Sequence, residues 1–178
     1  MSKKVAILIA PRGTEEPEFT KPKAALEDAG MDVTVVGLST DEAETVNNDL
    51  DPASRIAVDK AIENVSASDY DAVVVPGGTV GADKLRASKD AVAFVRAVLD
   101  AGKPVAAICH APWVLIETGQ LKGRTLTSYP TVQSDIRNAG ATWVDQEVAR
   151  DKGLITSRDP DDLPAFCKAL IAELQGDG

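Results

Sequence analysis

Residues 104–113 read PVAAICHAPW: five small or apolar residues, a cysteine, the chain's only histidine and, shortly after it, a proline. An unbroken apolar run of this kind is typical of a strand that is buried on both faces of a parallel sheet. The next segment, APWVLIETG (111–119), has a helical pattern with a proline near its start. The stretch therefore predicts a strand that ends at Cys109 and a helix that begins at once, which is the strand–turn–helix geometry of a nucleophile elbow.

The same alternation of strand and helix extends in both directions from this stretch. The apolar runs predicted as strands cover residues 5–11, 33–39, 71–78, 104–109, 124–130 and 154–158. The segments with helical spacing cover residues 18–31, 88–103, 111–119, 132–140 and 161–174. Strands that alternate with helices predict an α/β fold with a parallel sheet covered on both faces. Residues 44–65 lack strong periodicity, so we expect an irregular excursion or a short hairpin there.

The composition is that of a globular protein and narrows the possible partners. With 178 residues, 44% of them hydrophobic, the chain fits a single domain spanning residues 1–178. The formal net charge is −9 and no cluster of Lys and Arg is visible, so we expect no nucleic-acid binding. No apolar run approaches the length of a membrane span, and two distant cysteines do not indicate a disulfide framework. We therefore expect a protein of the reducing cytoplasm.

In such a sheet the functional residues follow the carboxyl ends of the strands. Cys109 is a candidate nucleophile, because a helix N-terminus close to the sulfur lowers the pKa of a thiol; the alternative is a buried cysteine that only packs. His110 must take part in any Cys–His chemistry, since it is the only histidine; the alternative is a surface residue at a helix start. One histidine also excludes the usual zinc and haem frameworks, so we expect neither metal nor cofactor. Cys167, in the amphipathic last helix, is expected to pack in the core.

Two further sets of residues follow strands. Glu15, Glu16 and Glu18 come after the first strand, where acids normally serve the helix dipole, and we accept that explanation for the first two. A carboxylic acid buried at the position of Glu18 would have a raised pKa and could donate a hydrogen bond to a thiolate. Gly77 and Gly78 end a strand, so their N–H groups either form an oxyanion hole or belong to a simple turn.

Together these segments resemble the ThiJ/PfpI superfamily of class I glutamine amidotransferase-like proteins, and most closely its PfpI-like, or general stress protein, branch. The resemblance covers essentially the whole chain. It rests on the segments EEPEF (15–19), DAVVVPGG (71–78), GKPVAAICHAPWVL (102–115), GRTLTSYP (123–130), NAGATWVDQEV (138–148) and ITSRDPDDLPAF (155–166). It implies a flavodoxin-like three-layer sandwich with a mostly parallel sheet, helices on both faces and a nucleophile elbow.

The resemblance also implies roles for individual residues. Cys109 matches the nucleophile, Glu18 the acid beside it, and His110 the adjacent histidine. In PfpI-like proteins an acid from a neighbouring subunit orients that histidine, which implies a homodimer or a higher oligomer. The matching residue is Asp83 in GADKLR, an aspartate where a glutamate is often found; the alternative is an ordinary acid near a helix N-terminus. We also assign Trp113 and Tyr129, together with the glycine pair, to oxyanion or substrate binding.

Two departures from related proteins limit the expected activity. The chain has no later histidine in a His-x-Glu pattern, so a glutaminase is not expected, and Tyr129 stands where other relatives carry a histidine. Only the adjacent-histidine arrangement remains. The resemblance implies a stress-associated enzyme that acts on small reactive carbonyls or on modified proteins, as a glutathione-independent glyoxalase or a deglycase. The alternatives are an intracellular cysteine peptidase and, among non-enzymes, a redox sensor or chaperone.

Overall fold

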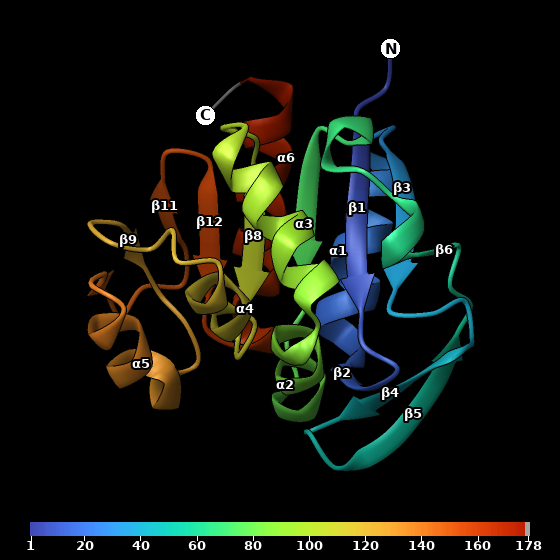
Figure 1. Ribbon diagram of the computed structural model, residues 1–178, viewed down its shortest axis with the longest axis horizontal. Coiled ribbons are helices and arrows are strands. Elements are labelled where there is room, and N and C mark those ends of the chain that lie inside the picture. The colour runs from blue at the N-terminus through green and yellow to red at the C-terminus, as the bar shows by residue number, and fades with distance from the viewer. Residues whose placement is uncertain (177–178) are drawn as a thin grey trace.

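A seven-stranded sheet forms the centre of the molecule, with helices on both of its faces (Figure 1). The computed structural model describes residues 1–176. In spatial order the strands are β11 (Ala149–Asp151), β12 (Leu154–Ser157), β8 (Val105–Ile108), β7 (Ala72–Val75), β1 (Lys4–Ile9), β3 (Asp32–Gly37) and β6 (Lys60–Ala61). Every pair is parallel except β11 with β12. The chain proceeds outward from β1 through β3 to β6 and then returns to β7 on the other side of β1, so the strand order reverses between β1 and β7.

The two faces of the sheet bury separate clusters of apolar side chains. In β1, Ala6 and Leu8 point to one cluster, while Val5, Ile7 and Ile9 point to the other. The first cluster is covered by α2 (Thr79–Ala87), α3 (Lys89–Asp100), α4 (Pro112–Glu117) and α5 (Gln133–Asn138). The second is covered by α1 (Glu16–Asp28) and α6 (Leu163–Gln175), which lie behind the sheet in Figure 1. The predicted α/β fold with a mostly parallel sheet is confirmed.

Two smaller sheets and several short turns complete the molecule. One sheet joins β2 (Arg12–Glu15), β4 (Ala43–Asn47) and β5 (Asp51–Ile56), and the other joins β9 (Thr125–Leu126) and β10 (Thr142–Trp143). The 3₁₀ turns are η1 (Ile62–Asn64), η2 (Ala67–Asp69), η3 (Pro130–Val132) and η4 (Pro160–Asp162). Strands β4 and β5 are antiparallel, which confirms a hairpin in the segment that lacked periodicity.

Two predicted elements differ from the structure. The strand expected over 124–130 stops at Leu126, because the following backbone serves as an anchor: the Thr127 N–H donates to Thr156 Oγ1 (2.9 Å) and the Tyr129 N–H donates to the Cys109 carbonyl (2.9 Å). The second difference is α2, a nine-residue helix directly after Gly78 where none was predicted. Asp83 therefore lies in the middle of a helix rather than at its N-terminus.

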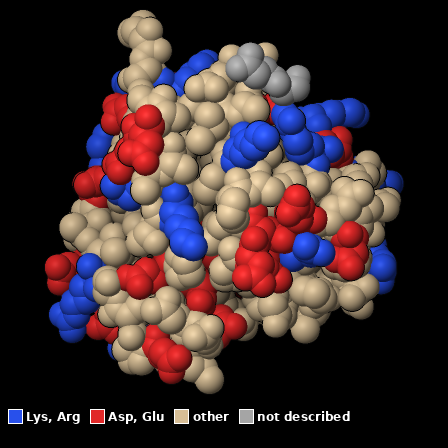
Figure 2. Space-filling model, turned by 180° about the vertical axis from the view of Figure 1, so that it is seen from behind, with Lys and Arg blue, Asp and Glu red and all other residues tan. Residues whose placement is uncertain are grey.

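The surface carries charges of both signs. On the face formed by α1 and α6, basic and acidic side chains are interspersed (Figure 2). Within residues 1–176, none of the helices combines the length and the apolar character needed to cross a membrane.

Candidate active site

Cys109 occupies a strained turn between β8 and α4. Its φ of +64° lies in the left-handed region, which costs a non-glycine residue about 1–2 kcal/mol. Neighbouring strands and loops hold it there: its N–H donates to the Ser157 carbonyl (3.1 Å), and its carbonyl accepts from the Tyr129 N–H (2.9 Å). The predicted strand–turn–helix geometry is therefore present, and it delivers the sulfur to the carboxyl edge of the sheet. The Cys109 residue is only 6% exposed.

Glu18 lies beside this turn, completely buried in the first turn of α1. Its Oε1 accepts a hydrogen bond from the Gly77 N–H (3.0 Å), while its Oε2 is buried with no hydrogen-bond partner among residues 1–176. Burial, together with the charge of Glu15, raises the pKa of Glu18 to about 8, although contacts with Cys109 and Gly77 oppose the rise. Glu18 is therefore mostly protonated at neutral pH, as the sequence led us to expect for a carboxyl buried there.

The glycine pair makes this close arrangement possible, and its two members have different roles. A Cβ on Gly77 would lie 2.6 Å from Glu18 Oε1 and 2.8 Å from the Cβ of Cys109, so no larger residue fits between them. The Gly77 N–H is already used by Glu18. The N–H groups of Gly78 and His110, in contrast, lower the pKa of the Cys109 thiol. The oxyanion-binding role expected for the glycine pair stays a prediction.

His110 turns toward the sulfur even though it is adjacent in the chain. Its Nδ1 lies 3.2 Å from Cys109 Sγ, and its ring stacks on Tyr129 with centroids 4.7 Å apart. Thr79 Oγ1 contacts the same ring at nearly equal distances from its two nitrogens, 3.5 Å from Nδ1 and 3.4 Å from Nε2. Burial lowers the pKa of His110, and the charge of Asp49 opposes this. The neutral imidazole with its proton on Nε2 leaves Nδ1 free to accept the thiol proton.

The direction of the thiol pKa differs from the sequence-based expectation. Burial, followed by the charge that Glu18 would carry if ionised, raises the pKa of Cys109, while the N–H groups of Gly78 and His110 oppose the rise. A short helix N-terminus does not overcome this burial. The same burial favours the neutral forms of Glu18 and His110. The Nδ1 atom of His110, 3.2 Å from the sulfur, is close enough to accept the thiol proton.

A cavity of about 290 Å³ opens onto the sulfur. It is lined by Glu15, Glu18, Asn48, Asp49, Cys109, Tyr129 and Pro160. Tyr129 is thus placed to touch a bound molecule. Trp113 is not: it packs edge-on against the back of the His110 ring, at 5.0 Å between centroids, and its Nε1 donates to Asp135. Trp113 does not line this cavity but supports the histidine ring, and the substrate-binding role expected for it stays a prediction.

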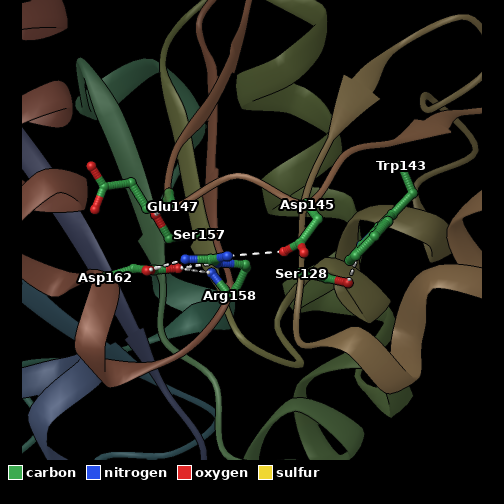
Figure 3. A network of polar contacts seen from close by, with 7 residues as sticks. All are labelled: Ser128, Trp143, Asp145, Glu147, Ser157, Arg158 and Asp162. Atoms are coloured by element: carbon green, nitrogen blue, oxygen red, sulfur yellow. Dashed lines mark hydrogen bonds and ion pairs between the residues drawn. The ribbon is translucent and has the colours of Figure 1, made fainter.

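The wall of the cavity at Pro160 is fixed by an ion-pair network that Figure 3 shows. Arg158, the first residue after β12, donates to both carboxylate oxygens of Asp162 and to Asp145, each at 2.9 Å. Two-pronged guanidinium–carboxylate contacts are among the more rigid ion pairs. They hold the turn that carries Pro160 close to the end of β12, whose Ser157 carbonyl anchors Cys109.

Two residues, Asp83 and Cys167, lie apart from this centre, and a third, Asp49, lines its cavity. Asp83 lies on the exposed side of α2, and its side chain forms no hydrogen bond or ion pair within residues 1–176. Cys167 is half-buried against the core under α6, as expected, and burial raises its pKa to about 11. Asp49 was missed by the sequence reasoning. Its signal was the tripeptide Asn47–Asn48–Asp49, since Asn and Asp favour the positive φ of tight hairpin turns.

In the part of the chain that the structure describes, no group of three or more His, Cys, Asp and Glu side chains could hold a metal ion.

A flavodoxin-like sheet with a cysteine at a strained elbow, an adjacent histidine and a buried acid defines the class of the protein. The model of the DJ-1/PfpI family matches residues 3–173, and the chain belongs to this family. The resemblance seen in the sequence is thereby confirmed.

Similar proteins carry several names. The chain is 42% identical to "Putative cysteine protease YraA" of Bacillus subtilis, covering 93% of this chain and 95% of the relative. It is also 42% identical to "Protein/nucleic acid deglycase 2" of Escherichia coli, covering 96% and 97%. "General stress protein 18" of Bacillus subtilis is 40% identical, with 98% and 99% covered. Among solved structures, Drosophila melanogaster DJ-1beta matches with a TM-score of 0.89 at 36% identity, covering 99% of this chain and 92% of that one.

Proposed function

We propose that the protein is a stress-associated, cysteine-dependent enzyme of the cytoplasm that acts on small reactive carbonyl compounds, as a glutathione-independent glyoxalase or a deglycase. The observation that carries the proposal is the 3.2 Å contact between Cys109 Sγ and His110 Nδ1, in a cavity of about 290 Å³ that Glu18 also lines. A cavity of this size suits a small dicarbonyl such as methylglyoxal better than an extended peptide. The relatives named as a deglycase and a stress protein support the same class.

The first step follows from the neutral resting forms of the three side chains. His110 Nδ1 accepts the thiol proton while the sulfur attacks the aldehyde carbon of methylglyoxal, and a C–S bond forms as the C=O π bond breaks. We assign stabilisation of the oxyanion to the N–H groups of Gly78 and His110, which lower the pKa of the Cys109 thiol. Proton transfer from the imidazolium to this oxygen completes a hemithioacetal.

The second step moves a proton between neighbouring carbons. The C–H proton of the hemithioacetal carbon is removed and the adjacent carbonyl oxygen gains a proton, which gives an enediol. A proton added to the former carbonyl carbon and loss of the hydroxyl proton at the sulfur-bearing carbon then give a lactoyl thioester of Cys109. We assign this transfer to His110 and Glu18, since a carboxyl with a pKa of about 8 both gives and takes protons near neutral pH. Water then cleaves the thioester, which releases lactate and restores the thiol. The sum is methylglyoxal plus water to lactate, and no cofactor is consumed.

The test is lactate formation from methylglyoxal in the absence of glutathione, followed by proton NMR. We expect saturable turnover, and release of free amines from methylglyoxal-treated peptides if the same chemistry acts on glycated protein. An enzyme preparation that is inactive toward both substrates would contradict the carbonyl proposal.

The second candidate is a cysteine peptidase, which the relative named "Putative cysteine protease YraA" favours. The same thiol, imidazole and N–H donors permit acyl transfer to a peptide carbonyl. Casein cleavage measured on the same preparation separates the two activities. A redox sensor would instead show oxidation of Cys109 by low doses of peroxide and no turnover of either substrate.

We further propose that the enzyme is a homodimer in which Asp83 of one subunit completes the site of the other. Asp83 is exposed on α2, close in sequence to Val80, which is 45% exposed. Val80 and Leu50, the latter 84% exposed, line a groove of about 440 Å³ between α2 and the β4–β5 hairpin. Exposed apolar side chains next to an unpaired acid favour this face as the contact with a second copy.

Replacing Asp83 by alanine is then expected to lower turnover by about 10- to 100-fold, the size of a general acid–base effect, and to leave alkylation of Cys109 largely intact. Mixing inactive Cys109→Ser with Asp83→Ala should restore part of the activity, because one site of each mixed dimer has both residues. Light scattering and subunit exchange followed by mass spectrometry provide the control. If the subunits exchange and no activity returns, Asp83 does not act across the interface.

A further inference from the structure

The tip of the β4–β5 hairpin reaches into the candidate active site. Its two turn residues, Asn48 and Asp49, both have positive φ, at +51° and +64°. Asn and Asp tolerate this conformation better than other non-glycine residues. The tip lies far from Cys109 in the sequence, yet both turn residues line the cavity that opens onto the sulfur.

Glu15 locks the hairpin tip in place. This glutamate is 7% exposed, and its two carboxylate oxygens accept hydrogen bonds from the N–H groups of Asn48 (2.7 Å) and Asp49 (3.0 Å). The Glu15 N–H in turn donates to the Gly77 carbonyl (3.2 Å). The helix-dipole role expected for Glu15 is therefore incomplete, because its side chain joins the tip of the hairpin to the glycine pair beside Cys109.

Asp49 links the hairpin tip to Thr79, the residue that contacts His110. Its Oδ1 accepts a hydrogen bond from the N–H of Thr79 (2.8 Å), the first residue of α2. The hydroxyl of the same threonine contacts the imidazole of His110, 3.5 Å from Nδ1 and 3.4 Å from Nε2. A continuous set of contacts thus runs from the hairpin tip to the imidazole ring of His110.

The charges around His110 explain why an acid is needed there. Cys109 contacts Nδ1, Tyr129 stacks on the ring, and Glu18 is mostly protonated. Arg86 of α2 faces the ring only across Trp113, with its guanidinium 5.2 Å from the indole, and Asp83 points to solvent. Within this chain, Asp49 is the carboxylate whose charge opposes the effect of burial on His110.

We propose that Asp49 is a positioning residue, which fixes His110 through Thr79 with Nδ1 turned to the sulfur and stabilises the imidazolium that forms when the thiol proton is accepted. Thr79 Oγ1 contacts the imidazole ring, and the Thr79 backbone is held by Asp49. A carboxylate near an imidazole that gains charge in the reaction plays the part of the third member of a catalytic triad. The proposal rests on the proposed role of His110 as the base, and it holds within one chain, whether or not Asp83 acts from a second.

The Asp49→Asn variant tests this directly. Asparagine retains the positive φ and can still accept from the Thr79 N–H, so the change removes the charge alone. Because His110 is the only histidine, its ring signals in NMR spectra report on it without assignment. We expect the titration midpoint of His110 to shift downward in Asp49→Asn, since the imidazolium loses its counter-charge. The matched control is Asp51→Asn, which removes the same charge from an exposed position of the same hairpin.

Two outcomes would overturn the proposal: a His110 midpoint in Asp49→Asn equal to that of the wild type, or a shift in Asp51→Asn as large as the shift in Asp49→Asn. Thr79→Val provides an independent variant, because it keeps the N–H that Asp49 accepts and removes only the hydroxyl. In that variant we expect the ring ¹⁵N shifts of His110 to change, because the hydroxyl that contacts the ring is lost; unchanged shifts would contradict the route through Thr79. Both readouts need no substrate, so failure of the carbonyl proposal leaves them interpretable.

Discussion

Replacing Cys109 by serine is expected to lower the turnover of methylglyoxal by at least about 10³-fold, because loss of the nucleophile removes the covalent route and leaves only the surrounding donors. A serine hydroxyl fits the space but gives up its proton far less readily than a thiol. The strained backbone at φ +64° is retained, since the exchange is nearly isosteric. Lactate formation measured by NMR under saturating substrate reports the loss.

Cys167→Ser supplies the matched control for this experiment. It removes the chain's other thiol, which is half-buried under α6. We expect the wild-type rate, and we expect iodoacetamide in the native protein to label Cys109 before Cys167. Equal rates for wild type and Cys109→Ser would eliminate Cys109 as the nucleophile, and faster labelling of Cys167 would argue in the same direction.

The second large effect is expected at Glu18. Glu18→Gln keeps an oxygen that can accept from the Gly77 N–H but cannot transfer a proton, so turnover should fall by about 10²- to 10⁴-fold. Glu18→Leu removes the donor as well, and we expect a further rise in the pKa of the Cys109 thiol. Glu16→Gln, two residues away on the same helix and only half-buried, is the matched control. An unchanged ultraviolet thiolate titration in both Glu18 variants would reduce Glu18 to a structural acid.

The pH dependence of stability provides a separate readout of Glu18. Its pKa is about 8 in the folded protein, against 4.5 as the ordinary value. Below pH 4.5 the Glu18 carboxyl is protonated in both the folded and the unfolded protein. Between pH 4.5 and pH 8 the unfolded protein has lost this proton while the folded protein keeps it, so the free energy of unfolding falls as the pH rises toward 8. Glu18→Gln has no such loss, so the Tm of this variant minus the Tm of the wild type should increase between pH 5 and pH 8. A constant difference across that range would show that Glu18 is not protonated in the folded state.

The sequence predicted the sheet and the elbow because both depend on local patterns. The run that ends at Cys109 is continuously apolar, and a proline follows at the start of the next helix, so strand and helix are each visible in a short window. Burial of Glu18 could also be expected, since its helix begins at the same sheet edge. These features require only the periodicity of apolar residues and the rule that sites lie at the carboxyl ends of strands.

Other features depend on contacts between distant segments and were therefore missed. The Asp49 carboxylate reaches Thr79 only because a hairpin folds back over the sheet edge and Glu15 holds its tip. The raised pKa of the thiol follows from burial by several elements, whereas the sequence displays only the nearby helix start. The edge-on contact of Trp113 with His110, at 5.0 Å between ring centroids, likewise depends on how α4 is placed against the end of β8 and could not be predicted from the sequence.

The central claim is that the sulfur of Cys109 forms a covalent bond with the carbonyl substrate. The most direct test is peptide mapping by mass spectrometry, kept at acidic pH, of enzyme quenched with acid during turnover of methylglyoxal, because a thioester survives under acidic conditions. We expect a mass increase of one methylglyoxal unit, present as the lactoyl thioester, on the peptide that contains Cys109, and none on the peptide that contains Cys167. Turnover of methylglyoxal to lactate with Cys109 unmodified throughout, or with the adduct on another residue, would contradict it.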